Sequence, residues 1–160
     1  MQNFEKLIPG LVDGGVEFVI VGGFAAVIHG VTLVTRDLDV CIPFTVKNCE
    51  ALLQSVQNIH PFHRMDSNRS PLKETPESLS HFKNLYLNTD LGTIDFLGRI
   101  DGVGSYPEVL KYAVKIKLFN RSCNVLDIDA LIKAKKEMKE AKDKQAVIQL
   151  EAIKQKQTKK

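Results

Sequence analysis

The sequence has few cysteines, no long apolar run and little excess charge, and each shortage excludes a class of protein. Its three cysteines, Cys41, Cys49 and Cys123, form no Cys-x-x-Cys pair and no disulfide framework, and none has zinc-ligand spacing with a histidine. No apolar stretch approaches membrane-spanning length, and the N-terminal stretch "MQNFEKLIPGLVDGG" lacks the apolar centre of a signal peptide. We therefore expect a reduced, cytoplasmic protein without a membrane segment.

The formal net charge is only +3, and much of the excess comes from the terminal stretch "KQKQTKK". Such a stretch favours a solvated end over a nucleic-acid-binding face, because that face needs basic residues clustered on a folded surface. The chain has 160 residues, of which 44% are hydrophobic and 26% charged, as in an ordinary globular protein able to bury one core. We predict one domain over residues 1–155 and a basic, disordered tail over residues 156–160.

The spacing of apolar residues predicts a mixed α/β chain. Strands are expected at residues 16–21, 35–43, 81–89, 93–98, 113–119 and 123–127. Helices are expected at residues 2–12, within 22–30, at 45–57, as a short helix after the loop 101–108, and as a consecutive pair within 127–153. Residues 58–80 are rich in Pro, Ser, Asn and charge, which predicts a long, partly irregular excursion.

Two aspartates alternate with apolar residues in "VTRDLDVCIP", residues 34–43. Because residues i and i+2 of a strand share a face, Asp37 and Asp39 would lie side by side, and their repulsion requires a positive charge nearby. A pair of carboxylates is a favourable site for Mg²⁺, which completes its shell with water and substrate phosphate. The alternative for an isolated Asp-x-Asp is a strand end exposed to solvent.

Two further features bear on this site. The Gly22-Gly23 pair follows a predicted strand and precedes a predicted helix, a junction that lets a phosphate approach the backbone, although it also fits a plain tight turn. Asp95, in "TIDFLG", is an acid on another predicted strand, with Ile94 and Phe96 facing the other way. Alone it fits an exposed position, but if its strand pairs with that of Asp37 and Asp39, three carboxylates would meet.

Taken together, the glycine turn, the Thr-x-Asp-x-Asp strand and the later strand aspartate resemble the nucleotidyltransferase superfamily typified by DNA polymerase β. The nearer likeness is to small bacterial nucleotidyltransferase-like proteins and to abortive-infection toxin–antitoxin enzymes. The resemblance runs from about Val16 to Asp95 and weakly onward. It implies an α/β (α+β) fold in which helices pack against a mixed sheet.

The resemblance also implies a set of site residues. Gly22 and Gly23 match the pair that holds the phosphates of the incoming NTP, and Asp37 and Asp39 match the two metal-binding acids. Asp95 matches the third acid, which binds the catalytic metal and helps activate the acceptor hydroxyl. The implied cofactor is Mg²⁺, with Mn²⁺ as its substitute.

The C-terminal helices carry a weaker signal. Lys135, followed by Lys142 and Asp143, is similar to the lysine and Lys-Asp pattern of toxin-type members, in which the lysine lies near the active site. The same stretch, "KAKKEMKEAKDK", equally fits a solvated amphipathic helix. Phe24 follows Gly23 where many superfamily members have serine, which favours the tRNA-end-adding and toxin-type branches.

The implied reaction is the two-metal, in-line transfer of a nucleoside monophosphate from an NTP to an acceptor hydroxyl, with loss of pyrophosphate. A small molecule, a tRNA end or a protein side chain could be the acceptor, and the chain is short enough that a second copy or a partner protein could complete the cleft. Two alternatives stay open. The chain could be a catalytically silent nucleotide- or protein-binding module, such as an antitoxin, or a plain structural α/β domain.

Several polar side chains have no firm role in this scheme. His60, His63 and Arg64 lie at the start of the 58–80 excursion, where they could reach a substrate phosphate or base but fit equally well as solvated loop residues. His29 lies at a predicted helix end, where a capping role is the commoner explanation.

Overall fold

The computed structural model describes residues 2–158. Its helices are α1 (Phe4–Asp13), α2 (Gly22–Ile28), α3 (Val46–Val56), the 3₁₀ turn η1 (Gln57–Ile59), α4 (Pro76–Leu79), α5 (Tyr106–Lys111), α6 (Ile128–Glu137) and α7 (Ala141–Thr158). Its strands are β1 (Val19–Val21), β2 (Asp37–Cys41), β3 (Phe62–His63), β4 (Asn84–Thr89), β5 (Gly92–Leu97), β6 (Arg99–Ile100), β7 (Gly104–Ser105), β8 (Ala113–Leu118) and β9 (Arg121–Leu126).

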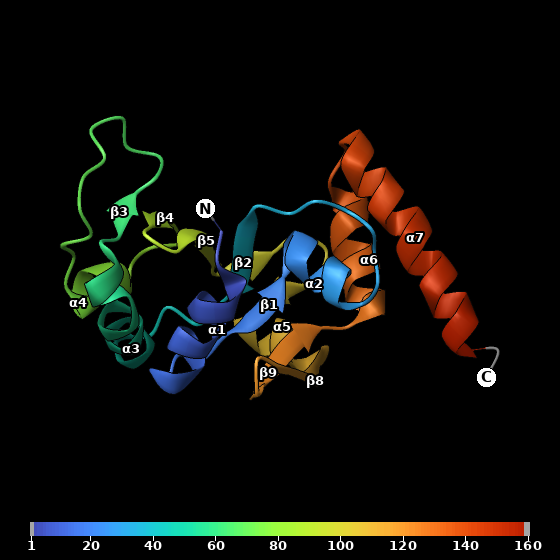
Figure 1. Cartoon of the computed structure of the whole chain (residues 1–160), viewed down its shortest axis with the longest axis horizontal. Coiled ribbons are helices and arrows are strands. Elements are labelled where there is room, and N and C mark those ends of the chain that lie inside the picture. The colour runs from blue at the N-terminus through green and yellow to red at the C-terminus, as the bar shows by residue number, and fades with distance from the viewer. Residues whose placement is uncertain (1, 159–160) are drawn as a thin grey trace.

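The main sheet has seven strands in the order β3-β4-β5-β2-β1-β9-β8. It is mixed, because β2 is parallel to β5 but antiparallel to β1, and β1 is parallel to β9. The helices α6 and α7 lie at one end of the molecule, and the long loop between β3 and α4 lies at the other (Figure 1). The expected mixed sheet with packed helices and a C-terminal helical pair is confirmed.

The core lies along the central strands, where apolar side chains alternate with polar ones. Leu38 and Val40 on β2, like Ile94 and Phe96 on β5, are completely buried. Burial of these apolar side chains determines which face of each strand is turned inward, since side chains of a strand alternate between two faces. The intervening polar side chains of β2 and β5 are therefore directed to the opposite face of the sheet.

The C-terminal end of the chain differs from expectation in detail. The helix α7 continues to Thr158, so residues 156–158 are helical where the sequence predicts a disordered tail, and residues 159 and 160 lie outside the described residues. Leu150 and Ala146 of α7 are buried, which explains why this helix persists despite its otherwise polar sequence. Within residues 2–158, no helix combines the length and the apolar character needed to cross a membrane.

The 58–80 excursion is largely irregular, as the sequence predicts, but it is attached to the sheet. Phe62 and His63 form the short edge strand β3, which pairs antiparallel with Asn88 and Leu87 of β4. This attachment brings Arg64, which directly follows β3, over the sheet face, a position that the composition of the loop did not indicate.

Asn48 connects α3 to the ends of two central strands. Its side chain is 2% exposed; Oδ1 accepts a hydrogen bond from the Glu17 backbone N–H at 2.7 Å, and Nδ2 donates to the carbonyls of Glu17 and Pro43, both at 3.1 Å. Because buried polar groups are costly to leave unpaired, this side chain stabilises the entry to β1 and the exit from β2 together.

We expect Asn48→Ala to lower the free energy of unfolding by about 1–3 kcal/mol, because it removes a buried side chain and leaves three partly buried backbone groups without partners. Asn58→Ala is a matched control at an exposed position and should change the stability by no more than about 0.5 kcal/mol. Urea denaturation of the three proteins measures the difference, and equal stabilities would show that Asn48 has no structural role.

Candidate active site

The Gly22-Gly23 turn lies directly beside the acids of β2. Gly22 has a left-handed backbone, with φ of +69°, and a Cβ placed on it would lie 2.5 Å from Oδ2 of Asp39. A Cβ on Gly23 would lie 3.1 Å from Oγ1 of Thr35. Glycine is therefore required at Gly22 both by conformation and by the close approach of the turn to the Asp39 carboxylate.

The register of the sheet explains this proximity. Val21, the last residue of β1, pairs with Asp39 across the antiparallel β1–β2 ladder, so the turn that follows β1 comes to the place where Asp39 lies. Asp37 is exposed at the start of β2, while Asp39 is half-buried, and both share the face opposite to Leu38. The alternation that the sequence predicts for this strand is confirmed.

Five of the six residues that the sequence singles out line one cleft of about 860 Å³. They are Gly22, Gly23, Asp37, Asp39 and Lys135. The cleft thus brings together the start of α2, one face of β2 and the C-terminal part of α6, which is far from the other two in the sequence.

Asp95, the sixth, lies next to this cleft on β5. It pairs with Asp39 in the parallel β2–β5 ladder, so the two carboxylates are neighbours on one face of the sheet, and Asp95 is only 8% exposed. Its carboxylate binds Arg64, whose Nη2 donates to Oδ1 at 2.6 Å and to Oδ2 at 2.7 Å. Sequence reasoning did not assign this role to Arg64, for which the only signal was a basic residue in a long polar excursion.

The charges of the three acids affect one another. Burial, followed by the negative charges of Asp95 and Asp37, raises the pKa of Asp39 to about 6, and the positive charges of Lys135 and Arg64 oppose this rise only in part. Burial also raises the pKa of Asp95, and the hydrogen bond from Arg64 acts against it. Asp37, Asp39 and Asp95 are therefore costly to keep ionised together, which favours binding of a cation beside them.

Asp37 and Asp39 are the side chains in the cleft that fit a divalent ion, because they are two adjacent oxygen donors without a partner cation of their own. Within residues 2–158, no three Asp, Glu, His or Cys side chains are placed to bind one metal ion together. Asp95 is adjacent to the pair, but both of its oxygens are bound to Arg64. A cation in the cleft would therefore have two protein carboxylates available as ligands, with Asp95 beside them.

Lys135 reaches the cleft from α6 and is almost completely buried, with 9% of its surface exposed. Its Nζ lies 3.4 Å from Oδ1 of Asp143 on α7, and Asp143 is itself 3% exposed. The structure thus distinguishes between the two interpretations of this stretch: Lys135 is not on the solvated face of the helix. Its position depends on Asp143 and so on the packing of α7 against α6.

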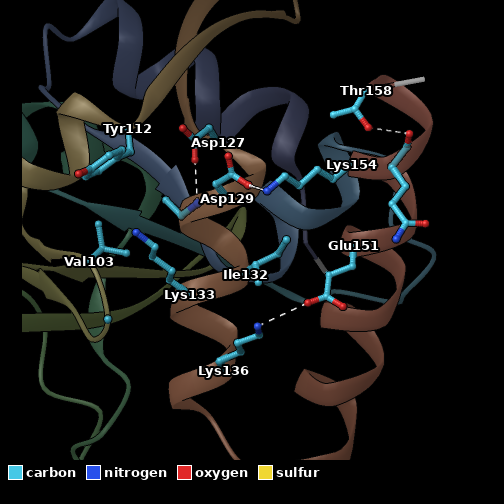
Figure 2. Close-up of a pocket in the computed structure, with 13 residues that line it drawn as sticks. Val103, Tyr112, Asp127, Asp129, Ile132, Lys133, Lys136, Glu151, Lys154 and Thr158 are labelled. Carbon is cyan, nitrogen blue, oxygen red and sulfur yellow. Dashed lines mark hydrogen bonds and ion pairs between the residues drawn. The ribbon is translucent and has the colours of Figure 1, made fainter. Parts of the chain in front are cut away.

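A second hollow, of about 880 Å³, is lined mainly by α6 and α7 and shares no lining residue with the first cleft (Figure 2). Its charged side chains are largely paired: Lys154 Nζ lies 2.5 Å from Asp129 Oδ1, and Lys136 Nζ lies 3.5 Å from Glu151 Oε1. None of the residues that the sequence singles out lines it. Its one lining glycine, Gly102, lies against Lys133 and Glu137 and not against a pair of acids, so we place the candidate active site in the cleft beside β2.

The histidines lie outside the cleft. His60 Nδ1 lies 2.5 Å from Oδ2 of Asp90, and His63 Nε2 lies 2.5 Å from Oε1 of Glu74. His29, at the end of α2, contacts the carbonyl oxygen of Leu126 through Nε2 at 2.8 Å. Each of these side chains has a structural partner within the chain.

Comparisons with known proteins support the fold. No family model and no curated protein sequence matches the chain. Among solved structures, the chain is similar to a lincomycin-bound crystal structure of the lincosamide antibiotic adenylyltransferase LnuA, with a TM-score of 0.62 and 12% sequence identity. The similarity covers 96% of this chain and 99% of that chain. At this identity the likeness shows the fold alone, which is nucleotidyltransferase-like, and it does not bear on the expected toxin–antitoxin branch.

We expect Asp39→Asn to stabilise the metal-free protein at neutral pH. The pKa of Asp39 rises from 3.8 to about 6 on folding. Ionisation of Asp39 therefore lowers the free energy of unfolding by its full amount above about pH 6, and has no effect below the unfolded-state pKa of 3.8. The gain should be about 1–3 kcal/mol at pH 7.5 and should disappear towards pH 4. Denaturation in EDTA at both pH values measures it, with exposed Asp101→Asn as the control. A gain independent of pH would contradict this account.

Proposed function

We propose that the chain is a Mg²⁺-dependent nucleotidyltransferase that moves a nucleoside monophosphate from an NTP to an acceptor hydroxyl. The observation that carries this proposal is the placement of Asp37 and Asp39 on one face of β2, with the left-handed Gly22 turn directly against Asp39. A carboxylate pair and a glycine turn in one cleft are the parts needed to hold a metal-bound triphosphate. The nucleotidyltransferase-like fold supports the same conclusion.

Each part of the cleft has a role in this proposal. The bare backbone of Gly22 and Gly23 lets the triphosphate come close to the turn, and Asp37 and Asp39 would hold the ion that it carries. Bound Mg²⁺ would neutralise phosphate charge and stabilise the charge that develops during in-line displacement. Lys135, held by Asp143, adds a positive charge to the same cleft.

Asp95 is the acid on the acceptor side of this arrangement. It lies beside Asp39, farther along the sheet from the glycine turn, where it would orient and polarise the acceptor hydroxyl. In the two-metal form of the mechanism Asp95 would also bind a second ion with one of the other acids. Arg64 Nη2 already contacts both Asp95 oxygens, so that form requires either that Arg64 leaves or that it takes the place of the ion.

The neighbour's name guides the choice of substrates to test. LnuA is an adenylyltransferase of lincosamide antibiotics, so ATP is the first donor to test and a small-molecule hydroxyl the first acceptor. The 3′ end of tRNA and protein side chains are the other acceptor classes. We propose that the protein acts in the cytoplasm, and that a second copy or a partner protein completes the acceptor side of the cleft.

We expect wild-type protein with Mg²⁺ and α-labelled ATP to transfer label to an acceptor from one of these classes and to release pyrophosphate. Asp37→Asn and Asp39→Asn should each reduce transfer by about 10²–10⁴-fold, because a carboxylate beside a divalent ion contributes several kcal/mol. Asp101→Asn, an exposed acid elsewhere, should keep wild-type transfer. If the Asp37→Asn, Asp39→Asn double variant labels acceptors as well as wild type does, the assignment of the acids is wrong.

The bond between Arg64 and Asp95 favours a second candidate function, a module that binds nucleotide without transferring it. Calorimetry with Mg²⁺ and a non-hydrolysable ATP analogue separates the candidates. We expect binding that Gly22→Ala weakens at least about tenfold, since its Cβ would meet Oδ2 of Asp39 in a strained backbone. Gly10→Ala is the matched control, because a Cβ there meets no atom within 4 Å.

The combined results decide among the three possibilities. Analogue binding together with transfer supports the enzyme, and binding without turnover of ATP on any acceptor class supports the silent module. If neither Mg²⁺ nor the analogue binds, the chain is a plain structural α/β domain.

A further inference from the structure

One row of residues crosses the sheet from its outer edge to the cleft. Asp39 on β2 pairs with Asp95 on β5, and Asp95 pairs with Tyr86 on β4. Beyond Tyr86, the backbone N–H of Arg64, just after β3, donates to the Tyr86 carbonyl at 3.0 Å. The guanidinium of Arg64 therefore reaches Asp95 across the face of the intervening strand.

The course of this side chain is set by the sheet as well as by the loop that follows β3. Arg64 Cζ lies 5.4 Å from the centre of the Tyr86 ring, within the range of a cation–π contact, and the side chain is 29% exposed. Backbone, ring and carboxylate together hold the guanidinium beside Asp95. Arg64 is therefore held in a fixed position beside Asp95, unlike a mobile charged side chain on the surface.

The contact with Asp95 has an unusual form. A single nitrogen, Nη2, contacts both carboxylate oxygens, at 2.6 and 2.7 Å, so it lies between them in the position where a chelated metal ion would be. Nη1 has only a weak contact of 3.8 Å with the sulfur of Met65, and Nε is buried without a partner. The usual paired-fork contact of arginine, which would engage two nitrogens, is not used.

The charges in the cleft agree with this position. Lys135 is already paired with Asp143, whereas the guanidinium of Arg64 faces the three acids. Burial would lower the pKa of Arg64, but the hydrogen bond and charge of Asp95, and then the charges of Asp37 and Asp39, raise it overall. Asp95 thus has a cation bound to its carboxylate, whereas neither Asp37 nor Asp39 forms a salt bridge among the described residues.

We infer that Arg64 occupies the position of the second metal ion, so that each chain binds one divalent ion, through Asp37 and Asp39, and Asp95 is not a metal ligand. This inference rests on the proposed function in one respect, the presence of a divalent ion at Asp37 and Asp39. Arg64 is then a positioning residue: it holds the Asp95 carboxylate on the acceptor side of the cleft and repels a second ion from it.

The number of bound ions tests this inference without any measurement of activity. Mn²⁺ is titrated into the metal-free protein, and free Mn²⁺ is followed by electron paramagnetic resonance. We expect one Mn²⁺ per chain in wild type and none in the Asp37→Asn, Asp39→Asn double variant. Arg64→Gln, which removes the charge but keeps much of the side chain, should bind two. Arg64→Lys, which retains a charge, should still bind one.

Two further variants complete the design. Arg121→Gln is the matched control, because Arg121 also bonds a carboxylate through Nη2, that of Asp13 at 2.7 Å. This pair lies at the start of β9, the end of that strand away from the glycine turn. The Arg121→Gln variant should therefore bind one ion. Asp95→Asn should also still bind one ion, since Asp95 is not a ligand. The ion count of Asp95→Asn tests the inference even if Arg64→Gln does not fold. Circular dichroism shows whether each variant is folded.

The outcomes are distinct. Two ions in wild type, or loss of the ion in Asp95→Asn, would overturn the inference and leave the proposed function standing. One ion in a folded Arg64→Gln variant would also overturn it, because Arg64 would not be what excludes the second ion. No ion in wild type would overturn the inference together with the metal requirement of the proposed function.

Discussion

Repulsion among three carboxylates is the constraint around which the cleft is built. The sheet brings these carboxylates together. Burial of Leu38 and Val40 turns Asp37 and Asp39 to one face, and the parallel pairing of β2 with β5 places Asp95 beside Asp39. Carboxylates that share a partly buried site stay ionised at neutral pH only with cations close by, and otherwise take up a proton. The neighbouring parts of the structure supply some of that charge and leave the rest for a ligand.

The three carboxylates do not have equally close cations, and this difference indicates where a bound cation would lie. Asp95 has its own resident cation in Arg64, and Lys135 is held in the cleft by a buried contact with Asp143. Asp39 has no salt bridge of its own among the described residues, and burial, followed by the charges of Asp95 and Asp37, raises its pKa to about 6. A site that is strained without a cation and relieved with one gains binding affinity at the expense of the stability of the empty protein.

Several of these features were accessible from the sequence because they depend on local chemistry. The alternation of "RDLDVC" predicts a shared face for Asp37 and Asp39, and paired glycines between a strand and a helix predict a turn that a phosphate can approach. Arg64 could not be found in this way, since its role depends on the edge strand β3, only two residues long, within an irregular stretch. Arg36, the residue just before Asp37, also lines the cleft.

The sequence by itself determined which residues can take part in the chemistry and on which face of its strand each would lie. It could do so because strand and turn preferences act over a few neighbouring residues. Only the tertiary structure decided which of them meet. By its sequence pattern Lys135 fits a solvated helix, and only the packing of α7 against α6 places Asp143 beside it. Likewise, only the pairing of β5 with β2 distinguishes Asp95 from any other acid on a strand. Contacts between segments distant in the chain depend on how whole elements bury their apolar faces, and no local pattern encodes that.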